Sequence, residues 1–393
     1  MAGLGRGRLG LLLLVLCLLL VSSAVIASVA EEEQELGGED DAGVEDSAEE
    51  DEVQGDDGDD APQECSGSFY EVIKLSNGVE MPKVGFGLAG MKGEATRECV
   101  RDHLARGFKL MDGAESTEWY DDESAGDELG KIDSVKREDV FIVSKIHPTR
   151  LSFEEAAKSV FEMLQRWNRT TYLDMVLLHY PECGSWIPNC KDKTGGDWKG
   201  AYRAMEEHYK AGRIRALGVS NFDVPRLNEL WEFAEIKPHA IQNWLDPFFQ
   251  SRDLVEWAKA HDVAFTSYSS FGMQWQFNWV KKNLVFESQV LRKIADAVDQ
   301  TVTGVILAWL IKKNIAVIPR STNPEHIAAN AYFLEQGYAD EILSPEQIAR
   351  IDALDGVFDA DPRDVCERVY NEGRCGDDGA GGWCRATCAG LDW

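Results

Sequence analysis

The sequence is poor in the features that mark several common classes of protein. No two of its cysteines have the CxxC spacing typical of structural zinc sites. Lys and Arg number only 40 against 69 Asp and Glu, which argues against nucleic-acid binding. Residues 31–60 contain no Lys or Arg and many acids, whereas organelle transit peptides are rich in Arg and poor in acids. We therefore expect no metal site, no nucleic-acid partner and no import into mitochondria or plastids.

The excess negative charge lies mainly near the N-terminus. Residues 31–60 hold 17 Asp or Glu, and without them the formal net charge changes from −29 to −12. Such a run repels itself and buries nothing. We expect residues 31–67 to form a disordered, solvated leader.

The first thirty residues have the order of parts found in a secretory signal peptide. Arg6 and Arg8 precede an apolar stretch at 9–21, and small residues lead up to Ala30. We expect residues 1–30 to be a signal peptide that is cleaved near Ala30. An uncleaved membrane anchor is the alternative, because residues 9–30 are long enough to span a bilayer. Both alternatives predict that the protein enters the secretory pathway and is either retained in the endoplasmic reticulum lumen or secreted. The protein would contact the membrane only if the anchor stays uncleaved.

The cysteines suit an oxidising compartment. Cys17 lies in the expected signal peptide, which leaves an even eight of the nine cysteines. Cys183 and Cys190 are close enough in sequence for a local disulfide bond, whereas Cys99 either pairs with Cys65 or is a buried thiol. The C-terminal tail at 357–393 holds four more, which can pair in three ways: Cys366, Cys375, Cys384 and Cys388.

A glycosylation acceptor sequence agrees with this route. Asn168-Arg169-Thr170 stands between an expected helix and an expected strand, which suits a surface turn. We expect a glycoprotein with disulfide bonds.

The rest of the chain alternates between short apolar runs and segments of helical period. Residues 70–79 alternate in polarity around Asn77-Gly78, the preferred centre of a two-residue hairpin turn. Helical period is clear at 153–164 and 302–310. Eight such units predict an α/β protein: a (β/α)8 TIM barrel at 68–356 with an N-terminal β-hairpin and an extended C-terminal tail. The expected strands are 83–88, 108–112, 140–145, 175–179, 214–219, 240–244, 263–268 and 315–318.

A Rossmann domain is the rival interpretation. Residues 85–90 match GxGxxG, and Asp112 lies 22 residues beyond, where an acid would bind a ribose. Against this, Pro82 interrupts the expected first strand, and Gly93 weakens the first turn of the helix that must follow. The barrel is favoured.

Polar residues end three of the expected strands. Asp112, Lys145 and His179 each follow an apolar run, and Tyr120 lies on the loop after Asp112. Singly, each has a simpler explanation, such as a helix cap or a core histidine. Together they predict an active site, because barrel enzymes carry their chemistry at the C-terminal ends of the strands.

Residues 70–355 resemble the aldo-keto reductase family, whose members are barrels that use NADPH without a Rossmann domain. The resemblance is carried by residues 143–145 (VSK), 176–181 (VLLHYP), 212–222 (GRIRALGVSNF) and 318–324 (IPRSTNP). It implies an oxidoreductase that reduces an aldehyde or ketone to an alcohol by hydride transfer from NADPH, with a small-molecule carbonyl substrate. We expect a monomer.

The resemblance also assigns roles to the four polar residues. Tyr120 would be the general acid that protonates the carbonyl oxygen, and a free phenol with a pKa of about 10 is a slow acid at neutral pH. Lys145 would lower the pKa of Tyr120, Asp112 would balance the buried lysine, and His179 would orient the carbonyl.

Positions that match the family's cofactor residues follow the later strands. Ser220, Asn221 and Gln242 match residues that hold the nicotinamide carboxamide, and Tyr268 matches the ring that stacks on it. Three others match the adenosine end, where a phosphate gains from amide donors and the helix dipole: Arg320, Ser321 and Asn330.

Several residues depart from the family pattern. Asp112 and Tyr120 are eight residues apart, where five is common, as if three residues were inserted. Gly113 replaces a threonine and Trp244 a glutamate. His326 and Ala329 replace an arginine and a glutamate at the adenosine end, so NADH stays an alternative to NADPH.

Loops that follow the strands would set the substrate. Trp119, Trp186 and Trp275 predict an aromatic, mostly apolar pocket wall, or alternatively a cover for the barrel rim. The leading hypothesis is an NADP(H)-dependent aldo-keto reductase of the secretory pathway. The alternative is a reductase-like barrel that binds a nucleotide or a partner without turnover.

Overall fold

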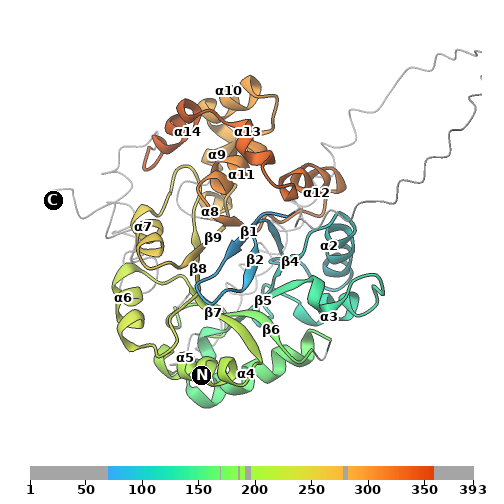
Figure 1. Ribbon diagram of the computed structural model, residues 1–393, viewed down its shortest axis with the longest axis vertical. Helices are drawn as coiled ribbons and strands as arrows, with labels where there is room; N and C mark the ends of the chain where they lie inside the picture. The colour runs from blue at the N-terminus through green and yellow to red at the C-terminus, as the bar shows by residue number, and fades with distance from the viewer. Residues whose placement is uncertain (1–69, 169, 185, 191–195, 278–281, 358–393) are drawn as a thin grey trace, which may run out of the picture. The chain divides into compact units, whose positions relative to one another are not determined.

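The computed structural model describes residues 70–357 except 169, 185, 191–195 and 278–281. The expected signal peptide, the acidic leader and the tail cysteines lie outside the described residues. Eight parallel strands follow one another round a sheet, and Val84 and Val317 bridge its two ends. Figure 1 shows the ring with its helices outside, which confirms the predicted (β/α)8 barrel. The strands are β3 (Gly85–Gly87), β4 (Leu110–Asp112), β5 (Phe141–Ile146), β6 (Leu173–Leu178), β7 (Ile214–Ser220), β8 (Ala240–Trp244), β9 (Ala264–Tyr268) and β10 (Ala316–Val317).

Helices connect successive strands and bury one face against the barrel. In α4 (Phe153–Arg166), the Ser152 side chain caps the first turn by accepting from Glu155 N at 3.2 Å, and Ala156, Val160 and Met163 are buried at helical spacing. No single described helix is long and apolar enough to span a membrane, although α10 (Gln289–Ala297) and α11 (Val302–Lys312) pass such a test as a pair bent by 86°. The main helices are α2 (Glu94–Ala105), α3 (Asp122–Leu129), α4 (Phe153–Arg166), α5 (Trp198–Lys210), α6 (Val224–Phe233), α7 (Arg252–Ala260), α8 (Met273–Phe277), α9 (Leu284–Glu287), α10 (Gln289–Ala297), α11 (Val302–Lys312), α12 (Pro324–Ala331), α13 (Tyr338–Ile342) and α14 (Pro345–Asp352).

An antiparallel hairpin of β1 (Val72–Lys74) and β2 (Glu80–Pro82) precedes the barrel, as predicted. Its turn is not the expected two-residue type. Leu75 N donates to Val79 O at 2.9 Å and Gly78 N donates to Leu75 O at 2.8 Å, and only Gly78 has a positive φ, of 85°. This longer loop needs a single left-handed residue, so the asparagine before the glycine keeps an ordinary conformation.

The barrel interior is an apolar cluster of its own, to which the hairpin contributes. Because successive side chains of a strand point to opposite faces, the residue two positions after the last inward apolar one also points inward. On β4, β5 and β6 that residue is Asp112, Lys145 and His179. Figure 1 shows the hairpin lying across the ring, and its apolar side chains join the interior cluster. The three polar groups lie at the C-terminal ends of their strands. The cluster consists of Ile73, Leu75, Met81, Leu110, Phe141, Val143, Met175, Leu177, Ala216, Ala240 and Ala316.

The positions of the glycines at 85–90 exclude the Rossmann alternative. Gly85 and Gly87 lie within β3 itself, and α2 begins only at Glu94. No helix N-terminus follows the third glycine directly, as a pyrophosphate site of that type requires.

Two other expectations concern Cys99 and Asn168. Cys99 is a free, buried thiol on α2, as one of its two alternatives stated, and Cys65 lies outside the described residues. Asn168 is exposed in the turn after α4, with a φ of 59°, while Arg169 lies outside the described residues.

Candidate active site

A buried ion pair lies at the C-terminal end of the barrel. Lys145 Nζ donates to Asp112 Oδ1 at 2.5 Å and to Gly113 O at 2.8 Å, and the two charged side chains are at most 3% exposed. Gln242 Nε2 donates to the other carboxylate oxygen of Asp112 at 2.7 Å. Buried charges need this kind of pairing and hydrogen bonding. Three of the predicted site residues therefore form one network.

Tyr120 and His179 lie beside this network. Lys145 Nζ is 5.1 Å from the centroid of the Tyr120 ring. The ring centroids of Tyr120 and His179 are 5.9 Å apart, with an angle of 70° between the rings. The longer segment between Asp112 and Tyr120 thus keeps the tyrosine ring among the other predicted catalytic residues.

The protonation states differ from the expectation for Tyr120. Burial, and then the carboxylates of Asp112 and Asp122, raise the pKa of Tyr120 well above its usual value. The expected lowering by Lys145 is wrong, because that ammonium is already paired with Asp112 and does not outweigh the loss of solvent. Burial, and then the charge of Lys145, hold the pKa of His179 well below its usual value. At neutral pH the site therefore presents an uncharged phenol and an uncharged imidazole.

The residues expected to hold the nicotinamide form a second network. Tyr268 Oη donates to Asn221 Oδ1 at 2.6 Å, and Asn221 Nδ2 donates to His179 O at 2.8 Å. Ser220 Oγ donates to Gln242 O at 2.7 Å. Asn221 has a φ of 62°, a left-handed conformation that asparagine adopts more readily than most residues. Hydrogen bonds thus join these cofactor positions to the catalytic ones.

The expected adenosine end lies after β10. Arg320 is exposed, and no carboxylate among the described residues forms an ion pair with it. Ser321 Oγ accepts from Asn323 N at 3.1 Å at the start of α12, and Asn330 is buried further along that helix. An unpaired guanidinium beside a helix N-terminus fits a phosphate group.

The chain matches the profile of the Aldo/keto reductase family over residues 83–356. It belongs to that family. A glyoxal reductase of Bacillus subtilis (strain 168) is 33% identical over 288 residues, which are 73% of this chain and 94% of that protein. The NAD(P)H-dependent D-xylose reductase I,II of Candida tropicalis is 30% identical over 302 residues, 71% of this chain and 92% of that protein. A crystal structure of an aldo/keto reductase from Brucella melitensis, 25% identical, has a TM-score of 0.62 and covers 73% of this chain and all of that one. Family membership supports an oxidoreductase that acts on carbonyl compounds.

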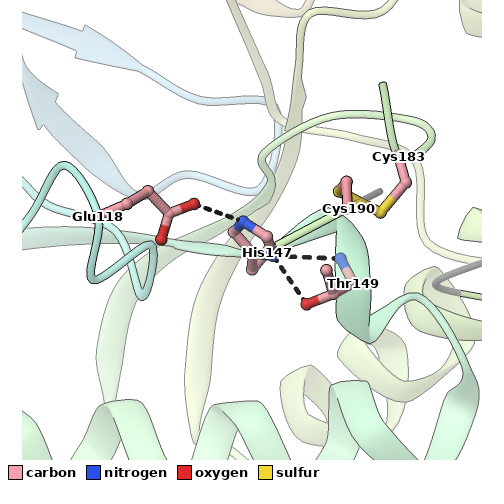
Figure 2. Close-up of a disulfide and its surroundings, with 5 residues drawn as sticks. All are labelled: Glu118, His147, Thr149, Cys183 and Cys190. Atoms are coloured by element: carbon pink, nitrogen blue, oxygen red, sulfur yellow. Dashed lines mark hydrogen bonds and ion pairs between the residues drawn. A yellow bond between two sulfur atoms is a disulfide. The ribbon is translucent and has the colours of Figure 1, made fainter. Parts of the chain in front are cut away.

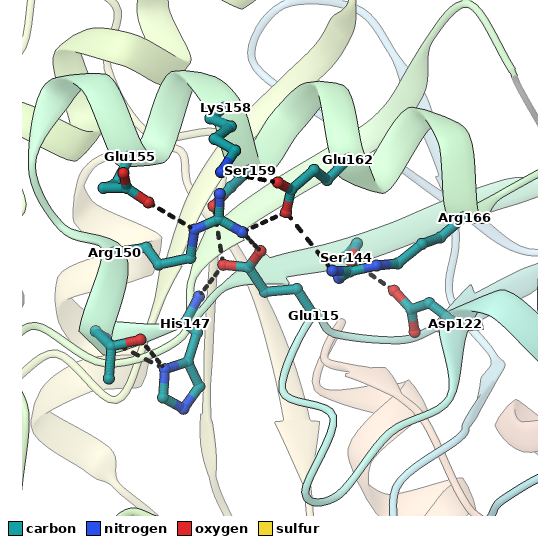
Figure 3. Close-up of polar contacts among 11 residues, drawn as sticks. Glu115, Asp122, Ser144, His147, Arg150, Glu155, Lys158, Ser159, Glu162 and Arg166 are labelled. Carbon is teal, nitrogen blue, oxygen red and sulfur yellow. Dashed lines mark hydrogen bonds and ion pairs between the residues drawn. The ribbon is translucent and has the colours of Figure 1, made fainter. Parts of the chain in front are cut away.

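A buried carboxylate that sequence analysis missed anchors the longer segment of this aldo/keto reductase. Glu115 accepts hydrogen bonds from His147 N at 2.6 Å, Ser159 Oγ at 3.1 Å and Arg150 Nη1 at 3.1 Å. Figure 3 shows these donors converging on Glu115 from α4 and from the segment before it. The residue stands in a strongly polar stretch, which is typical of an exposed loop, so its burial has no signal in the sequence.

A second buried carboxylate explains one departure from the family pattern. Asp122 accepts from Ala114 N at 3.0 Å, Ser144 Oγ at 2.8 Å and Trp167 Nε1 at 3.0 Å, and burial raises its pKa to about 7 against these bonds. A Cβ atom on Gly113 would lie 2.3 Å from Asp122 Oδ1 and 2.9 Å from the Trp167 ring. Asp122 and Trp167 therefore fill the space that a threonine side chain would need.

Aromatic side chains form part of the rim. The Trp119 and Trp186 rings stack with centroids 6.2 Å apart, and Tyr180 meets Trp186 edge-on at 5.1 Å. Trp186 is 50% exposed, as a rim position requires. The expectation that Trp275 also lines a pocket is wrong, because it is 0% exposed and donates its Nε1 to Asp246 Oδ2 at 2.8 Å.

The predicted local disulfide bond is present. Cys183 and Cys190 are joined, with their Cα atoms 5.3 Å apart, and they close the loop that carries Trp186. Figure 2 shows the bond in the surroundings of His147, whose Nε2 lies 2.8 Å from Glu118 Oε1. The bond thus constrains the loop that follows His179 at the mouth of the site.

Proposed function

We propose that this protein reduces an aldehyde or ketone to an alcohol with NADPH, and that Tyr120 donates the proton. The observation that carries the proposal is the buried Asp112, Lys145 and Gln242 network with Tyr120 and His179 beside it, at the C-terminal end of the barrel. That end is where barrel enzymes carry their chemistry.

The protein side chains would supply the proton and the hydrogen bonds. Tyr120 keeps its proton until a base as strong as a developing alkoxide takes it, because burial raises the pKa of the phenol. Lys145 can then support the phenolate that remains, since its ammonium lies 5.1 Å from that ring. The neutral His179 is suited to hold the carbonyl oxygen by a hydrogen bond. NADPH, when bound, supplies the hydride.

NADPH is favoured over NADH by one residue. Arg320 is an exposed, unpaired cation within the described part of the chain, and it stands beside the first turn of α12. A planar guanidinium binds a phosphate in two-point geometry, so it suits the additional phosphate of NADPH. The name of the Candida tropicalis relative includes both cofactors.

The aromatic rim supports a small, largely apolar carbonyl compound as the substrate class. Trp119 and Trp186 offer flat apolar surface, and the disulfide bond holds the loop that carries Trp186. The alternative of a binding protein without turnover is not favoured, since the relatives compared above are named as reductases.

The proposal is tested by replacing Tyr120 with phenylalanine. Tyr120→Phe should lower NADPH consumption with a panel of aldehydes by at least about 100-fold, because one general acid contributes that much. NADPH binding, followed by quenching of tryptophan fluorescence, should stay nearly the same. Tyr332→Phe is the matched control, since that tyrosine is 62% exposed. Equal rates in the parent and in Tyr120→Phe would remove Tyr120 from the mechanism.

We further propose that the protein is made in the secretory pathway. The disulfide bond at Cys183 and Cys190 and the exposed position of Asn168 support this compartment. Protein purified from its own source should lose mass on treatment with an N-glycosidase, and Asn168→Gln should remove that loss. An unglycosylated protein with all its cysteines reduced would contradict this localisation.

A further inference from the structure

Ser116 connects the two groups that would face a substrate carbonyl. Its Oγ lies 3.0 Å from Nδ1 of His179. Its carbonyl oxygen accepts from Tyr120 N and from Trp119 N, each at 2.9 Å. Ser116 is 1% exposed, and within the described part of the chain His179 is the only hydrogen-bond partner of its hydroxyl group. Ser116 thus contacts the turn that carries Tyr120 through its backbone and the His179 ring through its side chain.

The residue before it fixes the position of Ser116. Glu115 N donates to Lys145 O at 3.1 Å, which ties the backbone to the end of β5. The Glu115 carboxylate is held by donors on the other side, His147 N among them, as Figure 3 shows. Because backbone and side chain are both anchored, the Ser116 hydroxyl has little freedom to leave the histidine.

The contact with Ser116 affects which nitrogen of the His179 imidazole carries the proton. A neutral imidazole carries one proton, and its other nitrogen is an acceptor. A partner at one nitrogen therefore selects which nitrogen keeps the proton. Only the form with the proton on Nε2 leaves His179 with a donor on the side away from Ser116.

We propose that the Ser116 hydroxyl donates to Nδ1 of His179 and so keeps the imidazole proton on Nε2, where that N–H can form a hydrogen bond to the substrate carbonyl oxygen while Tyr120 transfers the proton. Ser116 is then a positioning residue that acts through His179. This inference rests on the proposed function for its catalytic consequence. Ser116 lies between Asp112 and Tyr120, in the segment that is three residues longer than the common family pattern.

The nitrogen chemical shifts of the histidine rings test the inference without a substrate. The full protein is labelled with 15N-histidine, and the spectrum of His179→Gln identifies which of the seven histidines is His179. In the parent we expect a protonated Nε2 and an unprotonated Nδ1. Ser116→Ala should move both signals toward the averaged values of two mixed forms, and Ser116→Thr should restore the parent pattern. A parent protein with its proton on Nδ1 overturns the inference without any variant, as does an unchanged Ser116→Ala spectrum.

Steady-state kinetics test whether Ser116 affects catalysis through His179. Ser116→Ala should lower kcat about tenfold with a nearly unchanged KM, because the hydrogen bond to the carbonyl is weakened rather than removed. Thr117→Ala is the control, since Thr117 is the exposed neighbour in the same segment, and its kcat should equal that of the parent. An unchanged kcat in Ser116→Ala would contradict the positioning role.

The two readouts separate this inference from the proposed function. If the parent consumes no NADPH with any aldehyde or ketone, the proposed function fails, and the nitrogen shifts still decide whether Ser116 selects the form of His179. If the parent is active but His179 carries its proton on Nδ1, the function stands and the role of Ser116 is rejected.

Discussion

Burial, more than neighbouring charge, sets the protonation of single residues at this site. It is the largest cause of the raised pKa of Tyr120, of the lowered pKa of His179 and of the raised pKa of Asp122. In each of these residues burial shifts the equilibrium toward the uncharged form. The ion pair of Lys145 and Asp112 is the contrast, because each charge has the other within hydrogen-bond distance. A carbonyl compound would therefore meet neutral donors with one ion pair behind them.

Gly113 shows how a single residue fits this arrangement. Gly113→Thr would restore the residue common in the family, yet its Cβ would lie 2.3 Å from Asp122 Oδ1 and 2.9 Å from Trp167. Overfilling a packed site costs about 1 to 3 kcal/mol, so we expect the free energy of unfolding to fall by that amount. Urea denaturation followed by tryptophan fluorescence measures it.

A double-mutant cycle supplies the control for Gly113→Thr. In an Asp122→Ala background the nearest clashing oxygen is gone, so the same substitution should cost less by about 1 kcal/mol. Equal costs in the two backgrounds would show that Asp122 does not fill the threonine space.

The site residues differ in how far the sequence could predict them. Asp112, Lys145 and His179 each follow an apolar strand, and alternation along that strand directs them inward, so pattern alone was enough. Glu115 and Ser116 could not be predicted, because their partners come from residues distant in the sequence. The pKa direction of Tyr120 was wrong for the same reason, since burial is a property of the folded barrel.

At the scale of elements, the strands were predictable and the contacts between them and the loops were not. The β8 range agrees with its prediction at both ends, because Pro238 shortly before it and Pro247 shortly after it limit the strand. Trp275 on α8 was expected either to line the pocket or to cover the barrel rim. Instead Asp246, just after β8, accepts from both Trp244 Nε1 and Trp275 Nε1 at 2.8 Å.

The Asp246 carboxylate connects α8 to the end of β8 by hydrogen bonds. Asp246 is 0% exposed, and besides the two indoles it accepts from Phe248 N at 2.8 Å. Burial raises the pKa of its carboxyl to about 7, in spite of these donors. The sequence of a loop does not indicate whether a tryptophan in it is buried or exposed. The outcome depends on whether a buried acceptor lies within reach of the indole N–H.

At the scale of the whole molecule, burial in the folded domain favours the uncharged form of several histidines. Burial is the largest cause of the lowered pKa values of His103, His179, His208 and His239, which come from α2, the end of β6, α5 and the start of β8. Each resists protonation in the folded state and accepts a proton readily once the chain unfolds. Acid should therefore unfold the barrel through these residues together.

His103 allows this consequence to be measured. Its ring stacks on Phe86 with centroids 4.2 Å apart, and burial lowers its pKa from 6.5 to about 4. A base with a lowered folded pKa contributes stability that is complete above pH 6.5 and is lost as the pH falls toward 4, by about 3 kcal/mol in total.

His103→Leu should remove that share of the pH dependence. The free energy of unfolding of this variant, measured in urea between pH 4.5 and 8, should therefore fall less steeply in acid than that of the parent. His326→Leu, on the exposed side of α12, should keep the parent slope. Parallel curves for His103→Leu and the parent would mean that this buried ring does not drive unfolding in acid.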